Sequence, residues 1–132
     1  MENRICGLKI FSEEKIIPCA GQGVIAVQCR KNDFENLKIL KKINDEDTKI
    51  CAITERSLLK TIGGDCHTAV GVYAKIDKNN IIIIAQLFSD DGLKSFSIKK
   101  IGDKKLPEKL GITAGKELLK KCEGYYKKKR WI

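Results

Sequence analysis

The chain has 132 residues, of which 42% are hydrophobic, a size that suits one compact domain or a small domain with a fragment of another. No apolar run approaches the ~20 residues needed to span a bilayer, and no signal-peptide core follows Met1, so we expect a cytoplasmic protein outside the membrane with six reduced cysteines. The net charge of +9 indicates acidic partners. Only four of the 26 basic residues are arginines, which bind carboxylates better than lysines do, so we expect much of this charge to be solvated surface.

The first 44 residues do not provide a complete set of secondary-structure elements. Residues 1–17 have only loose helical spacing, and residues 18–23 form a tight turn that contains two glycines. The nearly continuous apolar run 24–29 predicts a strand buried on both faces, and Asp33 is placed to cap a short amphipathic helix. Because nothing else here offers that strand a partner, we expect residues 1–44 to be a partial fragment of an α/β domain.

Residues 45–132 have the pattern of a complete α+β unit. A helix is predicted from about Asp45–Asp47 to Ile62, where Gly63 ends it. Turn residues then separate three predicted strands, which should form an antiparallel meander, and a last helix begins near Pro107. The strands are predicted at 70–77, 80–88 and 93–101. The expected fold class is therefore α+β, with a three-stranded antiparallel sheet packed against helices and preceded by the α/β fragment.

One cysteine, Cys66, is set on a glycine-rich turn between the predicted second helix and the first strand. Gly63 and Gly64 precede it and accept backbone conformations that other residues avoid, while His67, the chain's one histidine, follows it. This setting presents Cys66 as a loop thiol with a chemical role. A packing role also remains open, because most cysteines behave as small hydrophobic residues.

Other kinds of chemistry have weaker support in the sequence. No Cys-x-x-Cys pair is present, so we expect no metal site. Adjacent residues of an extended segment point to opposite sides, which places His67 poorly as a base for Cys66. The Gly-Gln-Gly at 21–23 lacks the rest of a phosphate-binding fingerprint. The basic, aromatic tail 125–132 suits RNA, although a solvated chain end is the expected role.

Three stretches, taken in their order and spacing, resemble hydroxymethylbilane synthase, also called porphobilinogen deaminase. They are residues 18–30, residues 54–59, and residues 63–66 together with the strand start at 70–74. The resemblance implies that residues 1–44 are the end of this family's second domain. It also implies that residues 45–132 are its C-terminal domain, to which the cofactor is attached.

The family is a transferase of tetrapyrrole and haem biosynthesis. It joins four porphobilinogen molecules into hydroxymethylbilane with release of ammonia, starting from a dipyrromethane cofactor held by a thioether to one cysteine. By position, the resemblance implies that Cys66 is this covalent attachment site and that Gln22 and Gly23 contact the cofactor and orient it. Asp65 stands where the family has a glycine, and Ala69 where it has a proline.

The resemblance implies no catalytic residue in this chain, because the family's catalytic aspartate and its arginine cluster belong to the other domains. The expected ligands are porphobilinogen-derived pyrroles rich in carboxylates, and the expected partner is a separate N-terminal chain of the same enzyme. Two alternatives are a small basic module that binds RNA or protein, with nucleic acid the less favoured ligand, and a remnant without catalytic activity.

Overall fold

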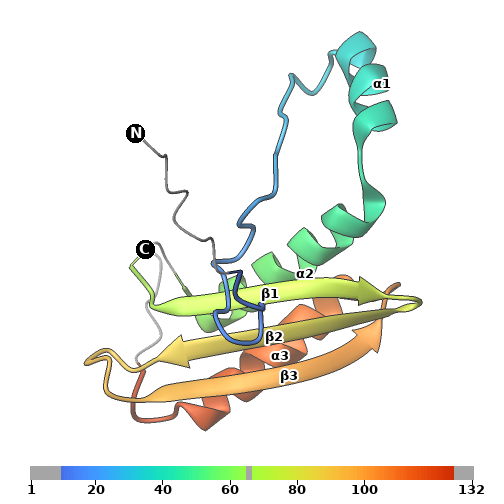
Figure 1. Ribbon diagram of the computed structural model, residues 1–132. Coiled ribbons are helices and arrows are strands. Elements are labelled where there is room, and N and C mark those ends of the chain that lie inside the picture. Colours follow the sequence, from blue (N-terminus) through green and yellow to red (C-terminus); the bar gives the residue numbers. More distant parts are fainter. Residues whose placement is uncertain (1–9, 65–66, 127–132) are drawn as a thin grey trace, which may run out of the picture.

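The computed structural model describes residues 10–64 and 67–126, which form a sheet with two helices against one of its faces (Figure 1). The strands are hydrogen-bonded antiparallel in the order β1-β2-β3. The predicted α+β class is therefore confirmed. The elements are α1 (Phe34–Ile43), α2 (Glu46–Ile62), β1 (Val70–Asp77), β2 (Asn80–Phe88), β3 (Ser95–Asp103) and α3 (Pro107–Lys121).

The helix boundaries follow the predicted capping residues. The side chain of Asp33 accepts a hydrogen bond from the backbone N–H of Asn36 at the start of α1. Gly63 ends α2 with a φ of 70°, a left-handed conformation that glycine adopts without steric cost. Pro107 starts α3, where its missing N–H costs no helical hydrogen bond.

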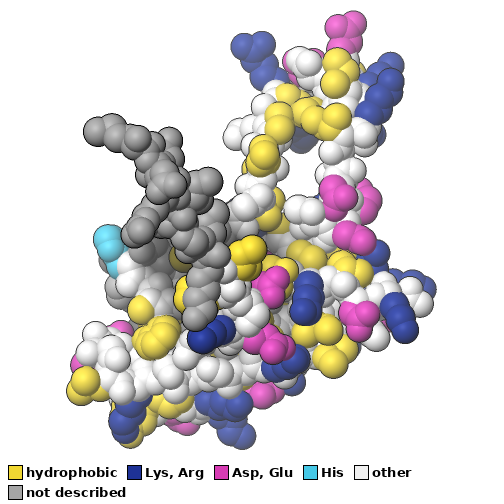
Figure 2. All heavy atoms as spheres, viewed as in Figure 1, with side chains coloured by type: hydrophobic (Ala, Val, Ile, Leu, Met, Phe, Trp, Pro, Cys, Tyr) yellow, Lys and Arg dark blue, Asp and Glu magenta, His cyan; other side chains and the backbone are white. Residues whose placement is uncertain are grey.

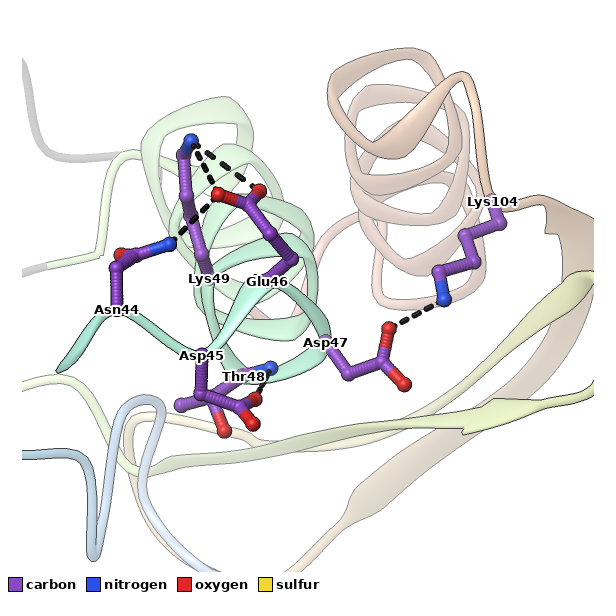
Figure 3. A network of polar contacts seen from close by, with 7 residues as sticks. All are labelled: Asn44, Asp45, Glu46, Asp47, Thr48, Lys49 and Lys104. Atoms are coloured by element: carbon purple, nitrogen blue, oxygen red, sulfur yellow. Dashed lines mark hydrogen bonds and ion pairs between the residues drawn. The ribbon is translucent and has the colours of Figure 1, made fainter. Parts of the chain in front are cut away.

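Polar contacts fix the first turn of α2 (Figure 3). Asp45 caps the helix by accepting the backbone N–H of Thr48 at 2.7 Å. Asp47 forms an ion pair with Lys104, which lies between β3 and α3. The start of α2 is thus tied to the segment that leads into α3.

The hydrophobic core lies between the sheet and the helices α2 and α3. Alternate residues of β2 face the helices and are fully buried, as the period of a strand with one covered face requires. Each large side chain of this kind stabilises the fold by about 1.5–3 kcal/mol. The largest fully buried residues are Leu58, Ile62, Val72, Ile81, Ile83, Leu87, Leu118, Thr54 and Cys122.

In the part of the chain that the structure describes, no helix combines the length and the apolar composition that crossing a membrane would require.

The strands β1 and β2 have the predicted bounds, but β3 begins and ends two residues later than expected. The delay comes from the loop before it. Ser89 and Lys94 close this loop through the backbone hydrogen bond from Ser89 N to Lys94 O (2.9 Å), and Asp91 accepts the backbone N–H of Leu93 (3.0 Å). Residues 93 and 94 therefore belong to the loop, and the ladder with β2 starts at Ser95.

The predicted strand at 24–29 is wrong, because this segment is irregular chain. A strand needs a hydrogen-bonding neighbour, and the described residues provide none here. The segment leads up to α1, which stands apart from the sheet and contacts none of the other described helices or strands (Figure 1). We call residues 24–43, which comprise this segment and α1, the arm, and hydrophobic side chains line it (Figure 2). The exposed ones are Val24, Ile25, Val27, Phe34, Ile39 and Ile43.

Residues 13–23, which we call the strap, cross the face of the sheet opposite the helices and then pass the free edge of β1 to reach α2 (Figure 1). Near one end, Glu14 forms an ion pair with Lys99 of β3 at 2.9 Å. Further along, the carbonyl oxygen of Pro18 accepts the backbone N–H of Val72 of β1 at 2.8 Å. The strap is therefore fastened to both outer strands of the sheet.

Candidate functional site

The last part of the strap is a tight turn that presents Gln22. The backbone N–H of Gln22 donates to the carbonyl of Cys19 (3.0 Å), and the Gln22 side-chain oxygen accepts the N–H of Cys19 (3.1 Å). Gly21 and Gly23 have φ values of 73° and 81°, which glycine adopts without strain. The turn thus holds Gln22 at the surface, with the oxygen of its amide already bonded.

A buried carboxylate, that of Glu55 on α2, holds this turn. Glu55 is only 5% exposed, and its two oxygens accept different backbone N–H groups, Oε2 from Gly21 and Oε1 from Ala74 of β1, each at 2.7 Å. Burial raises the pKa of Glu55 above its ordinary value, and the two hydrogen bonds oppose this shift. One carboxyl group thus joins the turn, α2 and β1.

The predicted attachment residue, Cys66, lies outside the described residues. Before it, α2 ends at Ile62 with Gly63 as its C-cap, and after it β1 begins at Val70. Gly64 lines a groove that Ala20 of the strap lines as well. The turn that carries Gln22 and the chain that enters the Cys66 loop therefore border the same groove.

The same groove carries positive charge. Arg56 and Lys60 of α2 and Lys116 of α3 line it, opposed by one acidic side chain, that of Glu108. Cations in such a groove suit ligands with several carboxylates. This group of cations was not identified from the sequence, because α2 and α3 are more than 40 residues apart along the chain.

The other candidate residues have no shared site. His67 is exposed, and no group of three or more metal-ligating side chains occurs within residues 10–64 and 67–126. Cys122 is buried in the core, and Cys51 is half-buried with its pKa raised to about 11, chiefly by burial and then by the charge of Glu55. A thiol with such a pKa is a poor nucleophile at neutral pH.

Sequence reasoning did not identify Glu55 as a site residue. It stands three residues before Leu58 and seven before Ile62, both fully buried, so it shares the apolar stripe of α2. A carboxylate on such a stripe must find hydrogen-bond donors. That position was the signal in the sequence, but the identity of the donors, Gly21 and Ala74, depends on the fold.

The turn borders open space at both of its glycines. Apart from chain neighbours, no group of the described residues comes within 4 Å of the place where a side chain would begin at Gly21 or Gly23. Exposed Gln22 can donate hydrogen bonds through its amide nitrogen, which suits carboxylate and carbonyl acceptors. These features would suit a cofactor made of pyrrole rings with carboxylate side chains.

Comparison with known proteins gives a consistent result. The family model described as "Porphobilinogen deaminase, C-terminal domain" matches residues 49–120. A "Probable porphobilinogen deaminase" of Nitrosopumilus maritimus is 36% identical over 111 residues, which are 84% of this chain and 36% of that protein. A "Porphobilinogen deaminase" of Caldicellulosiruptor saccharolyticus is 44% identical over 95 residues, 72% of this chain and 32% of that protein. One of Coxiella burnetii is 32% identical over 119 residues, 90% of this chain and 38% of that protein. The chain thus spans about a third of the length of these relatives.

Proposed function

Because the chain belongs to the porphobilinogen deaminase family, a family of transferases, we propose that it is the part of such an enzyme that carries the dipyrromethane cofactor on Cys66. In this proposal residues 45–132 are the cofactor-attachment domain, and residues 1–44 are the end of the preceding domain. The protein works in the cytoplasm, on pyrroles derived from porphobilinogen. It supplies the anchor for polymerisation but none of the catalytic groups.

The proposed attachment is a substitution at carbon. The thiolate sulfur of Cys66 forms a bond to the methylene of a porphobilinogen-derived pyrrole as the carbon–nitrogen bond breaks, and the nitrogen leaves as ammonia with the proton of the thiol. When bound, the dipyrromethane supplies the pyrrole end to which further units are added. Gln22 and Gly23 orient it through an amide side chain and a backbone group.

The observation that carries this proposal is the groove that Ala20 and Gly64 share. Ala20 is two residues from Gln22, and Gly64 is two residues from Cys66. The groove also holds the cations of Arg56, Lys60 and Lys116, which would pair with the acidic side chains of the pyrroles. This shared groove supports the proposal that Gln22, Gly23 and Cys66 act on one cofactor.

We propose that the catalytic groups come from a polypeptide equivalent to the N-terminal two thirds of these relatives, with which this region associates. The arm from Val24 to α1 would be the docking surface. Its hydrophobic side chains are exposed, with Ile25 90% and Phe34 69% accessible to solvent, and α1 contacts no other described element. Exposed apolar surface of this extent is typical of sites where another protein binds.

The test is the intact mass of the full chain purified from cells that make porphobilinogen, followed by peptide mapping around Cys66. We expect a dipyrromethane adduct on the peptide that contains Cys66. Cys66→Ser should abolish the adduct, whereas Cys19→Ser, which changes an exposed thiol in the strap, should leave it intact. An unmodified Cys66 in the wild-type chain, co-produced with the N-terminal partner, would overturn the proposal.

A further inference from the structure

We propose that Glu55 is a positioning residue for the cofactor site. Its carboxylate ties the turn that carries Gln22 to α2 and β1, the two elements that come before and after Cys66 in the chain. This inference rests on the proposed function, since it concerns the orientation of the cofactor on Cys66.

The geometry of the carboxylate supports this role. Gly21 and Ala74 are 53 residues apart in the chain, yet their backbone N–H groups donate to the two oxygens of one side chain at 2.7 Å each. Hydrogen bonds of this length to a charged acceptor are among the strongest in proteins. Near its end the strap therefore has a second fastening, beside the bond from Val72 to Pro18.

The role requires two acceptor atoms, which makes it separable from simple packing. Glutamine has the same shape as glutamate but offers one oxygen and one NH₂ group, so it can accept only one of the two N–H groups. In Glu55→Gln, either Gly21 or Ala74 would face another donor. Ala74 belongs to β1, which β2 holds in place along its whole length, whereas Gly21 lies in a surface turn. The hydrogen bond of Gly21 is therefore the one that should be lost.

Within residues 10–64 and 67–126, no cationic side chain pairs with Glu55. Its pKa is raised by burial, which the hydrogen bonds from the N–H groups of Gly21 and Ala74 oppose. The ionisable groups coupled to Glu55 are Cys51 on α2 and Tyr73 on β1, whose pKa values are both raised, so both stay neutral in the acid range. Hydrogen bonding to Gly21 should therefore follow the ionisation of Glu55 itself.

The experiment compares Glu55→Gln with Glu46→Gln, which makes the same chemical change at an exposed position of the same helix. Amide hydrogen exchange of the full chain reports on Gly21. In Glu55→Gln its amide should exchange about tenfold faster or more, as expected when a hydrogen bond to a charged acceptor is lost, while Glu46→Gln leaves it unchanged. After correction for intrinsic exchange, protection of Gly21 should fall at acid pH in the wild type and show no such step in Glu55→Gln.

The second readout is the fraction of chain that carries the adduct on Cys66 in cells that make porphobilinogen. We expect a lower fraction in Glu55→Gln than in Glu46→Gln. Unchanged exchange at Gly21, or faster exchange with undiminished loading, would overturn the positioning role while leaving the proposed function in place. A wild-type chain that carries no adduct when co-produced with the N-terminal partner would instead overturn the proposed function. If Glu55→Gln does not fold, Glu55→Asp, which is too short to reach both N–H groups, takes its place.

Discussion

Gly71 of β1 lies against the carbonyl oxygen of Ile17, so closely that a methyl group at position 71 would come within 2.6 Å of that oxygen. Real contacts to a Cβ atom do not reach this distance, and the oxygen belongs to the backbone, which cannot rotate away. The strap can follow its path across the sheet because residue 71 has no side chain.

The substitution Gly71→Ala should therefore push the strap away from β1. The hydrogen bond from Val72 to Pro18, one residue further along each segment, should weaken with it. Limited proteolysis should cut the strap faster in Gly71→Ala than in the wild type, with the region from α2 to α3 still resistant. Ser95→Ala, at an exposed position of β3, is the control, and equal cleavage rates in the two variants would contradict this account.

A second close approach lies between the two long helices. A Cβ atom at Gly115 of α3 would come within 2.8 Å of the Cβ of Thr61 in α2. Alanine normally stabilises a helix relative to glycine, by roughly 1 kcal/mol. Here overpacking should reverse the sign, so that Gly115→Ala lowers the free energy of unfolding by about 1–3 kcal/mol in chemical denaturation. Lys120→Ala, exposed on the same helix, should change it little, and a stabilised Gly115→Ala would show that the helices are further apart.

The raised pKa of Glu55 predicts how stability depends on pH. Because its pKa in the folded state lies above the ordinary value of 4.5, the folded protein binds more protons than the unfolded chain between these two values. The free energy of unfolding should therefore fall as the pH rises through this window. Denaturation of wild type and Glu55→Gln at a series of pH values should show this loss only in the wild type. If the free energy of unfolding depends on pH in the same way in both proteins, Glu55 does not have a raised pKa in the folded state.

The proposed partner interface predicts that one apolar side chain of the arm matters for assembly. Ile25→Asp should weaken association with a chain equivalent to the N-terminal two thirds of the family, because a charge would have to be buried at the interface. Leu93→Asp is the matched control, since Leu93 is 84% exposed and Ile25 90%, but Leu93 lies in the loop before β3. Co-purification should fall for Ile25→Asp alone, and equal recovery of both variants would contradict the proposed interface.

The sequence predicted those elements whose ends carry local signals. Asp33 and Gly63 mark helix ends through their own backbone and side-chain bonds, so their effect does not depend on distant residues. The same holds for Pro107 and for the turn between β1 and β2. Local chemistry was insufficient for β3, because Lys94 is held in the loop by a bond to Ser89, five residues earlier.

Long-range contacts were the part that the sequence could not provide. The apolar run 24–29 has the composition of a buried strand, but a strand forms only with a neighbour. For Glu55 the hydrogen-bond donors are present, but they come from two segments, at Gly21 and Ala74, that meet only in the complete fold. The groove cations on α2 and α3 likewise meet only in three dimensions. The proposed roles of Cys66, Gln22 and Gly23 come from family resemblance and remain predictions.

The contacts made by Val72 and Ala74 have a consequence for where the domain can be cut. Both backbone N–H groups donate outside the β1–β2 ladder, to Pro18 and to Glu55, so these two donors on the free edge of β1 are already occupied. A chain that began at residue 45 would lack the strap, so the backbone N–H of Val72, on an edge strand, would have lost its hydrogen-bond acceptor, the carbonyl oxygen of Pro18. Such edges pair readily with other chains. We therefore expect the smallest unit that stays monomeric to begin before residue 45. It should include residues 13–23, because these residues occupy donors on the edge of β1 that would otherwise pair with other chains.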